Sequence, residues 1–471
     1  MRYISTRGQA PSLGFADVLL TGLARDGGLY MPASWPELAA ATIAEFAGKP
    51  FHEVAAALFG AFLGGDLNEA QVAAIARDAY RRFGHPAVTP LRQIDCNVWV
   101  LELFHGPTLA FKDVAMQLLA RLMDQVLSAR GARVTVVVAT SGDTGGAAIE
   151  AFRGAERVNA VVLFPAGRIS DVQRRMMTTA REANVNALAI EGTFDDCQAL
   201  VKAMFNDLAF RDRLQLAAVN SINWARIVAQ LTYYFVAAVA LGGPARPVGF
   251  AVPTGNFGDI FAGFAAKTMG LPTERLVIAT NENDILYRAW NSGIYAPSQV
   301  VATSSPSMDI QVSSNFERFL YEASGRDAAG VRQQMLALRQ QGALALGEAA
   351  PAYRRHFVAE RVDAAAVGDC IRRVKAESGY LIDPHSACAL VAARRTQAAT
   401  GARHPMIALA TAHPAKFPDA IEAITGQRPA LPARLASLLS DPERITTMAN
   451  DLGAVKGFVK RCAEAAWGPV T

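Results

Sequence analysis

Through the middle of the chain, short apolar segments alternate with longer amphipathic ones, and this alternation restricts the fold more than any other feature of the sequence. The apolar segments predict strands at residues 97–101, 134–139, 158–163, 187–191, 247–252, 276–279 and 406–410. Helices are expected between them, at residues 113–130, from 144 onward, and at 171–183, 194–209 and 222–241. Strands that are separated by helices form a mostly parallel sheet with helices on both faces. We therefore expect an α/β fold.

Two regions depart from this alternation. In the first ninety or so residues, Ala-rich segments with helical spacing are separated by Gly and Pro, which predicts helices at 35–47, 51–62 and 69–83. Residues from about 320 to 378 are also Ala-rich, and we expect them to be helical. At 471 residues, the chain is long enough for two or three packed units.

The composition argues against several classes of protein. Hydrophobic residues make up 51% of the chain and charged residues 19%, so a large core is expected and long disorder is not. A net charge of +4 is too small to predict a nucleic-acid binder, although it permits a local site for an anion. We expect a small-molecule substrate, with neither nucleic acid nor a membrane as partner.

Cysteines and targeting segments give further expectations. The five Cys are scattered and form no CxxC pair and no Cys/His cluster, which argues against a disulfide framework or a metal site and is typical of a reduced, cytoplasmic protein. The first residues lack the charged-then-apolar pattern of a signal peptide. The longest apolar run, residues 233–241, is well short of the ~18 residues that a membrane span needs. We expect this run to be a buried core helix.

The strand expected at 247–252 leads into a Gly-rich turn, Gly255-Asn256-Phe257-Gly258-Asp259, and then into a helix. Glycines let successive backbone N–H groups converge, and a helix N-terminus adds partial positive charge, so such a turn binds phosphate without Lys or Arg. The same pattern is also typical of an ordinary strand-to-helix turn. It lacks the Lys-Ser/Thr ending of a P-loop and the full dinucleotide-binding spacing, which argues against a nucleotide site.

A second turn of this kind follows the strand expected at 134–139. Ser141, Asp143 and Thr144 lie among glycines at the start of a helix, where small hydroxyl groups and backbone N–H groups could bind a carboxylate. The alternative is an ordinary N-cap, and the two interpretations are compatible. Ligands of open α/β sheets bind at the carboxyl ends of the strands. The two turns could therefore hold a phosphate and a carboxylate in the same crevice.

Lys112 stands at the start of the helix expected at 113–130, after Leu109, Ala110 and Phe111. A Lys in the first turn of a helix is usually a solvated surface residue, and the helix dipole disfavours it there. In this case the apolar neighbours would exclude water from the amine, lower its pKa and make it a nucleophile or a base. An amine beside a phosphate site and a carboxylate site suggests a Schiff base with pyridoxal phosphate.

Two further segments offer polar groups near predicted helix and strand ends. Asn220 and Ser221 come just before the helix expected at 222–241, and Arg226 lies one turn into it. Together they could bind a second phosphate, although a capped helix with a surface Arg is the simpler interpretation of the segment alone. Thr411 follows the strand expected at 406–410, where its hydroxyl could reach a ligand ring or simply belong to a loop.

Together these segments resemble the threonine synthase family of pyridoxal phosphate enzymes, which have the tryptophan synthase β-like fold, fold type II. The resemblance extends over nearly the whole chain and looks closest to the longer-chain branch found in enterobacteria and fungi. It is carried by the segments HGPTLAFKD (105–113), TSGDTGGAA (140–148), NSINWAR (220–226), PTGNFGD (253–259) and ATAHPAKF (410–417), with further matches near the N-terminus, at 195–202 and at 307–318.

The resemblance implies a role for each candidate residue. Lys112 would form the Schiff base with the cofactor, Thr411 would face the pyridine nitrogen, and Asp143 would lie near the 3′-oxygen of the ring. The cofactor phosphate would be held by Gly255, Asn256, Phe257, Gly258 and Asp259. The substrate carboxylate would be bound by Thr140, Ser141 and Thr144, and the substrate phosphate by Asn220, Ser221 and Arg226.

The resemblance also implies the reaction and the domain organisation. The reaction would convert O-phospho-L-homoserine and water to L-threonine and phosphate, the last step of threonine biosynthesis, carried out by a monomer or homodimer. The expected domains are a mainly helical one at 1–92, a catalytic α/β region at 93–430 with a smaller lobe at about 131–220, and a C-terminal helical extension at 431–471. The alternatives left open are another fold type II lyase, such as a serine/threonine dehydratase, and a non-catalytic relative.

Overall fold

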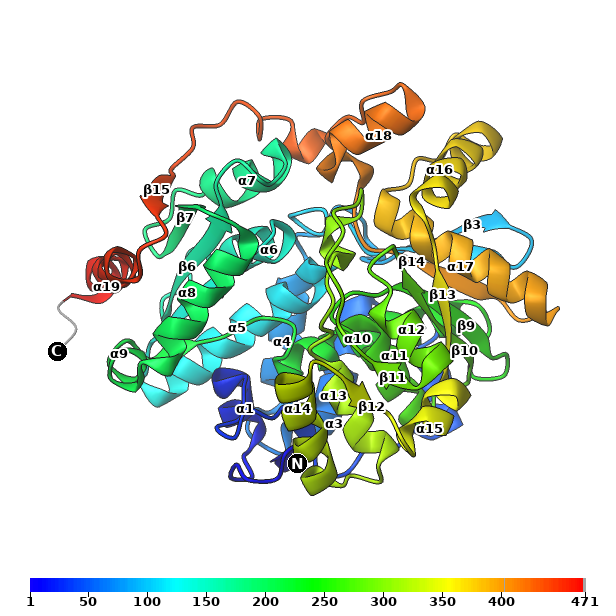
Figure 1. Cartoon of the computed structure of the whole chain (residues 1–471), viewed down its shortest axis with the longest axis horizontal. Helices are drawn as coiled ribbons and strands as arrows, with labels where there is room; N and C mark the ends of the chain where they lie inside the picture. The colour runs from blue at the N-terminus through cyan, green and yellow to red at the C-terminus, as the bar shows by residue number, and fades with distance from the viewer. Residues whose placement is uncertain (402, 469–471) are drawn as a thin grey trace.

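Two separate β-sheets organise the chain, which the computed structural model describes at residues 1–401 and 403–468. The larger sheet contains β3 (Leu91–Asp95), β4 (Val98–Glu102), β9 (Val248–Pro253), β10 (Thr273–Thr280), β13 (Phe357–Arg361) and β14 (Met406–Ala410), in the order β13-β10-β9-β14-β4-β3. The smaller sheet contains β5 (Val134–Ala139), β6 (Val158–Pro165), β7 (Val185–Glu191), β8 (Leu216–Ala217) and β15 (Thr446–Ala449), in the order β15-β7-β6-β5-β8. In Figure 1 the smaller sheet lies on the left and the larger on the right. The predicted α/β fold is confirmed.

The larger sheet is parallel except for β3, which runs antiparallel to β4. One face packs against α10 (Trp224–Ala240) and α11 (Gly258–Thr268), and the other against α16 (Ala364–Ser378) and α17 (Pro384–Thr400). Because helices cover both faces, β9 and β14 are buried along their whole length. This burial explains their continuous apolar sequences. The predicted core helix at 233–241 lies in α10, as expected.

All strand pairs of the smaller sheet are parallel. Its helices are α5 (Lys112–Arg130), α6 (Asp143–Phe152) and α7 (Asp171–Thr178) on one side, and α8 (Phe194–Asn206), α9 (Leu208–Leu214) and α19 (Leu452–Trp467) on the other. Helix α5 also packs against α10, so it connects the helices of the smaller sheet to those of the larger one.

The N-terminal region packs against α10 from below the sheets in Figure 1. It contains β1 (Tyr3–Ser5), α1 (Phe15–Thr21), β2 (Tyr30–Pro32), α2 (Ala40–Ala44), α3 (Phe51–Leu63) and α4 (Glu69–Tyr80). The helix predicted at 35–47 is correct only for the five residues of α2. Pro36 disfavours a helical backbone at Trp35, whose ring instead packs 5.9 Å from that of Trp224.

The helical character expected at about 320–378 is confirmed for most of the region, but short strands and turns interrupt it. This region and its surroundings contain α12 (Ile285–Ser292), β11 (Ile294–Tyr295), α13 (Phe316–Ala323), α14 (Ala328–Gln341), β12 (Leu344–Ala345) and α15 (Ala349–His356), followed by β13 and α16. Strand β13 pairs in parallel with β10 and forms one edge of the larger sheet. Strands β11 and β12 form a separate two-stranded sheet.

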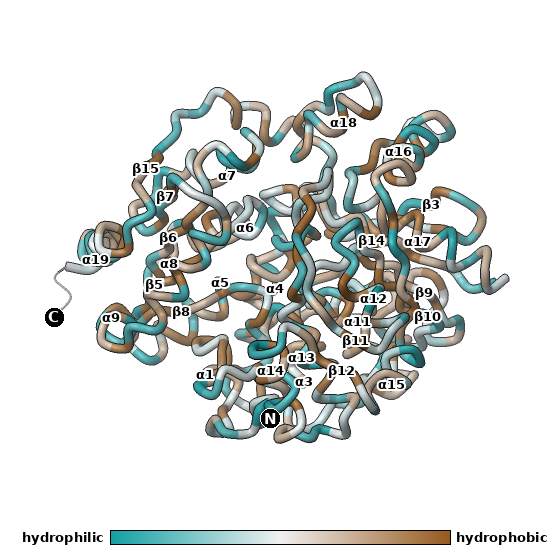
Figure 2. The backbone as a smooth tube through the Cα atoms, in the orientation of Figure 1, coloured by the Kyte–Doolittle hydropathy of each residue, from teal (hydrophilic) through white to brown (hydrophobic). Residues whose placement is uncertain are grey.

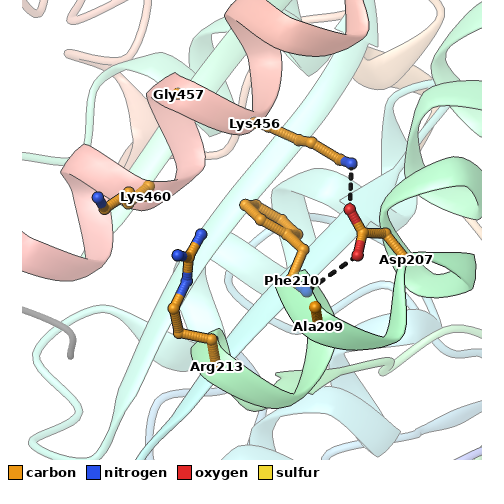
Figure 3. Close-up of a pocket in the computed structure, with 7 residues that line it drawn as sticks. All are labelled: Asp207, Ala209, Phe210, Arg213, Lys456, Gly457 and Lys460. Atoms are coloured by element: carbon orange, nitrogen blue, oxygen red, sulfur yellow. Dashed lines mark hydrogen bonds and ion pairs between the residues drawn. The ribbon is translucent and has the colours of Figure 1, made fainter.

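The C-terminal segment, expected to be a helical extension, also contributes a strand to the smaller sheet. After α18 (Pro418–Thr425) and a short turn at Ala433–Leu435, β15 pairs with β7, and α19 covers the outer face of the sheet. Residues 469–471 lie outside the described part of the chain. The amine of Lys456 on α19 lies 2.6 Å from the carboxylate of Asp207 and 5.3 Å from the ring centre of Phe210 (Figure 3). These contacts border a surface pocket of about 440 Å³ between α9 and α19.

Figure 2 shows hydrophobic residues along the strands and a mixture of hydrophilic and hydrophobic residues on outer helices such as α16. Among the described residues, no helix has the length and apolar character that crossing a membrane requires. The division into domains at residues 92/93 and 430/431 stays a prediction.

Candidate active site

Lys112 and Thr411 are far apart in the sequence, but the backbone segments that contain them pair with each other. Ala110 and Ala412 form an isolated antiparallel bridge, and the N–H of Phe111 donates to the carbonyl of Thr411 at 2.9 Å. Leu109, just before the bridge, has a φ of +59°, which turns the chain into α5. The start of α5 is thereby fixed against the carboxyl end of β14, a central strand of the larger sheet.

The amine of Lys112 is mostly enclosed, and its nearest acidic partner is Asp143, with Nζ 3.2 Å from Oδ2. Burial lowers the pKa of Lys112, and the positive charges of Lys416 and Arg226 lower it further, against the opposite effect of Asp143. A lowered pKa leaves more of the amine neutral, and a neutral amine can attack a carbonyl or accept a proton. The desolvation that was predicted from the neighbouring apolar residues is therefore present.

Asp143, the first residue of α6, is the centre of a group of polar contacts. Besides Lys112, its carboxylate receives hydrogen bonds from Gln173 and Ser307 at 3.0 Å each, and the amine of Lys416 lies 2.8 Å from Oδ1. Burial alone would raise the pKa of Asp143, but the two ammonium groups and these donors hold it well below its usual value. Asp143 is therefore a stable anion and not a proton donor.

The turn 255–259 presents its N–H groups and has its carbonyls occupied. Ser313 Oγ donates to the carbonyl of Gly255 at 2.7 Å, and the N–H of Asn315 donates to that of Asn256 at 3.0 Å. Within the described part of the chain, the backbone N–H groups of 255–259 have no protein acceptor. A Cβ on Gly255 would lie 2.8 Å from the carbonyl oxygen of Ser307, so only glycine fits there. This arrangement suits an anion such as phosphate.

The side chain of Asp259 does not join this anion site. Its Oδ1 accepts hydrogen bonds from the hydroxyls of Tyr233 and Tyr234 on α10, and burial raises its pKa to about 6. A carboxylate could not donate to a phosphate in any case. Of the five residues predicted for the cofactor phosphate, Asp259 can therefore contribute only its backbone N–H.

The second turn, at 140–144, is organised by Thr140. Its Oγ1 accepts hydrogen bonds from the N–H groups of Gly142 and Gly145, both at 2.9 Å, and its side chain is buried. Thr140 thus holds the turn, whereas the N-cap of α6 is Gly142, and Ser141 and Thr144 are partly exposed. The alternative of an ordinary side-chain cap by Ser141 or Asp143 is not realised, and the hydroxyls of Ser141 and Thr144 stay accessible.

The predicted second phosphate site lies at the start of α10. Asn223 caps this helix by accepting from Ala225 at 3.0 Å, and Asn220 is exposed. The Oγ atoms of Ser221 and Ser314 lie 3.4 Å apart, and Ser314 in turn donates to Asn256 at 3.3 Å. A line of polar side chains therefore connects this site to the turn 255–259.

Arg226 is the most unusual residue of this group. It is 3% exposed and, among the residues that the structure describes, donates one hydrogen bond to the carbonyl of Val219 at 3.2 Å and leaves its Nε without a partner. No acidic side chain of the described residues forms an ion pair with it, and burial lowers its pKa to about 10. The alternative of a surface Arg is therefore wrong.

The sequence analysis did not identify four residues around Asp143. Lys416, Gln173 and Ser307 contact its carboxylate, and His385 contacts Ser307. The ring of His385 accepts the N–H of Ser307 at 3.2 Å, and its other nitrogen lies 2.6 Å from Asp383. Lys416 belongs to the segment ATAHPAKF, one of the segments that carry the family resemblance. Its position a few residues after Thr411 in the sequence does not indicate that its side chain is buried.

Comparisons with known proteins agree over the whole chain. Residues 2–80 match the family model "Threonine synthase N terminus", residues 83–411 match "Pyridoxal-phosphate dependent enzyme", and residues 386–459 match "Threonine synthase, C-terminal". A curated threonine synthase from Pseudomonas aeruginosa is 50% identical over 98% of both chains.

Solved structures agree as well. The chain superposes with a TM-score of 0.95 on the crystal structure of a pyridoxal phosphate-bound threonine synthase from Brucella melitensis, at 55% identity and covering 98% of this chain and 99% of that one. The yeast threonine synthase structure gives a TM-score of 0.93 at 37% identity, covering 98% of both chains. These findings confirm the fold type and the enzyme class that the motifs predicted. The chain belongs to the threonine synthase family of pyridoxal phosphate-dependent enzymes.

Proposed function

We propose that this chain converts O-phospho-L-homoserine and water to L-threonine and phosphate, the last step of threonine biosynthesis, with pyridoxal phosphate as cofactor. Membership of the threonine synthase family supports the reaction. We also propose that it acts in the cytoplasm, as a monomer or a homodimer. One observation supports the substrate in particular: Arg226 is buried, forms no ion pair with an acidic side chain of the described residues, and is close enough to Lys112 to lower its pKa.

The residues present fit the proposed cofactor. The N–H groups of the turn 255–259 have no protein acceptor in the described part of the chain and would hold its phosphate. The enclosed amine of Lys112 would hold its aldehyde, with Thr411 at the ring nitrogen and Asp143 near the 3′-oxygen. When bound, pyridoxal phosphate supplies an electron sink for negative charge on the substrate carbons.

Two groups of residues would bind and orient the substrate. Ser141 and Thr144, in the turn that Thr140 holds at the start of α6, would donate to its carboxylate. Asn220, Ser221 and Arg226 would hold its phosphate. Fixing both ends of a small substrate aligns the carbons between them with Lys112, and such alignment contributes several kcal/mol to lowering a barrier.

Lys112 has a second task once the amine of the substrate has taken its place. Its neutral amine would accept the proton from Cα, and burial, by lowering its pKa, favours the neutral form that this role requires. A proton must also leave Cβ before phosphate can leave from Cγ; water would then add at Cβ, with a proton added at Cγ and one returned to Cα. Arg226 would stabilise the negative charge that collects on the departing phosphate, and a guanidinium that is already desolvated needs no rearrangement to do so.

A second buried arginine shows why Arg226 suggests an anion. Arg318 is also fully buried, and its pKa is lowered to about 9 by burial, but its guanidinium donates to the carbonyls of Tyr30 and Ile222 and to Asn315. Arg226 has a single carbonyl partner. A buried charge is costly unless hydrogen bonds or an opposite charge compensate it, so Arg226 suits a dianionic phosphate.

The experiment that tests the function follows one purified sample. The absorbance spectrum is recorded before and after addition of O-phospho-L-homoserine, and inorganic phosphate and threonine are measured in the same tube. Equal amounts of both products are expected. Production of ammonia from serine or threonine without phosphate release would favour a dehydratase, and no turnover of either substrate would favour a non-catalytic relative.

A further inference from the structure

A second buried lysine, Lys416, lies beside Asp143 and has no role in the reaction derived so far. It ends the short turn Pro414–Lys416 that follows β14, and it is 0% exposed. Its amine lies 2.8 Å from Asp143 Oδ1 and donates to the carbonyl of Thr108 at 2.8 Å. Lys416 follows a strand of the larger sheet, and its side chain contacts the first residue of α6, a helix that packs on the smaller sheet.

Lys112, Lys416 and Asp143 form a group with two possible positive charges and one negative charge. Two ammonium groups, on Lys112 and Lys416, share the single carboxylate of Asp143. Under the proposed function the amine of Lys112 would alternate between being bonded to the cofactor and being free, so its charge would change during each turnover. A buried carboxylate without a compensating cation is costly and takes up a proton instead. Among the described residues, Lys416 is the other ammonium group that contacts Asp143, so it can supply that cation throughout the reaction.

We propose that Lys416 is a positioning residue that serves as the permanent counter-charge of Asp143 while Lys112 reacts. The inference rests on the proposed function, because it requires the cofactor to be joined to Lys112. In this arrangement Asp143 would stay ionised and fixed at the ring of the cofactor. The charge of Lys416 would also weaken proton binding by the nitrogen of Lys112.

The backbone of Lys416 already accounts for the structural part of its role. Its N–H donates to the carbonyl of His413 at 3.0 Å, and its carbonyl accepts from Ser170 at 2.9 Å. The turn is thus attached to the segment before α7 without the side chain. If the side chain served only to fill space or to hold Thr108, a neutral donor of similar length would be sufficient.

Several charged groups act on the nitrogen of Lys112 and must be considered together. They are Asp143, which favours its protonation, and Lys416 and Arg226, which oppose it. The carboxyl group of Asp259 interacts with Lys112, and Asp113 interacts with Lys416. Of these groups, Lys416 is the one that also contacts Asp143 directly, so removing its charge should raise the pKa of the Lys112 nitrogen by about 1 unit or more.

The test is a pH titration of the visible absorbance of the cofactor-loaded enzyme. It compares wild type with Lys416→Gln, Lys416→Met and Lys416→Arg. Gln keeps a hydrogen-bond donor without the charge, Met keeps neither, and Arg keeps the charge. We expect the titration midpoint to rise by about 1 pH unit or more in the Gln and Met variants and to stay near that of wild type in the Arg variant. Lys267→Met, which removes a half-buried lysine on α11, is the matched control and should leave the midpoint unchanged.

The outcomes separate this inference from the proposed function. A Gln variant that titrates at the wild-type midpoint would show that only the hydrogen bond matters and would overturn the inference, as would a loss of turnover without a shifted midpoint. Borohydride reduction followed by peptide mapping is done on every variant. Label on Lys112 with an unshifted midpoint refutes the role of Lys416 alone, whereas an unlabelled Lys112 in wild type refutes the proposed function.

Discussion

Replacing Arg226 by Met is expected to separate substrate binding from stability. Arg226 is 3% exposed, and within the described part of the chain its guanidinium makes one hydrogen bond, to the carbonyl of Val219 at 3.2 Å. Losing that bond costs about 1 kcal/mol. Removing a buried charge that no acidic side chain of the described residues compensates regains several kcal/mol of desolvation. The free energy of unfolding of Arg226→Met without ligand should therefore equal that of wild type or exceed it by about 1–2 kcal/mol.

The effect on substrate should have the opposite sign. A charge-assisted hydrogen bond between a buried guanidinium and a phosphate contributes about 3 kcal/mol, which corresponds to a loss of about 100-fold in kcat/KM. Most of the loss should come from a raised KM for O-phospho-L-homoserine. The affinity for pyridoxal phosphate should change much less, because the proposed cofactor phosphate site uses the backbone of 255–259.

The assay is phosphate release at varied substrate, together with denaturant unfolding with and without inorganic phosphate. Phosphate should stabilise wild type by mass action and stabilise Arg226→Met less. The control is Arg130→Met, at the far end of α5 from Lys112, where the arginine is exposed and pairs with Asp17. Equal losses of cofactor and substrate affinity, or a clearly destabilised Arg226→Met, would refute the assignment of Arg226.

Three further predictions address other residues. Lys112→Ala should lose both the visible absorbance of covalently held cofactor and most turnover; absorbance that survives extensive dialysis would contradict the role of Lys112. Thr411→Asp should place a carboxylate at the ring nitrogen, favour its protonation and change both rate and side products; an unchanged product profile would contradict the placement of Thr411. Folding raises the pKa of Asp259 from 3.8 to about 6, so its contribution to stability is present below about pH 4 and is lost as the pH rises through about 6. Asp259→Asn should thus gain about 2–3 kcal/mol in free energy of unfolding relative to wild type between about pH 4 and pH 7, and a pH-independent difference would refute the burial argument.

The central strands could be predicted from the sequence because they are buried on both faces. Strand β5 begins and ends at the residues expected, since a parallel strand between two helical layers is a continuous apolar run. The edge strands could not. β13 is half exposed and therefore carries charged residues, and β15 is mostly exposed and pairs with a partner more than 250 residues earlier. Neither has the local pattern on which strand prediction depends.

In the candidate site, too, some features could be predicted from the sequence and others could not. Backbone features could be located from the sequence, because a glycine turn between a strand and a helix has a characteristic spacing, as at 255–259. Side-chain directions could not. Asp259 lies in the predicted turn but its carboxylate contacts two tyrosines of α10, and Lys416 becomes buried only where the two sheets meet. Such contacts depend on which distant elements pack together.

The pairing of β15 with β7 has a consequence for the order in which the protein is made. Synthesis runs from the N-terminus, so β7 leaves the ribosome long before its neighbour does, and the outer edge and apolar face of its sheet stay uncovered until β15 and α19 emerge. An uncovered strand edge is a template for pairing with other chains. Nascent or truncated chains that end shortly before β15 should therefore be the form of this protein that most needs a chaperone.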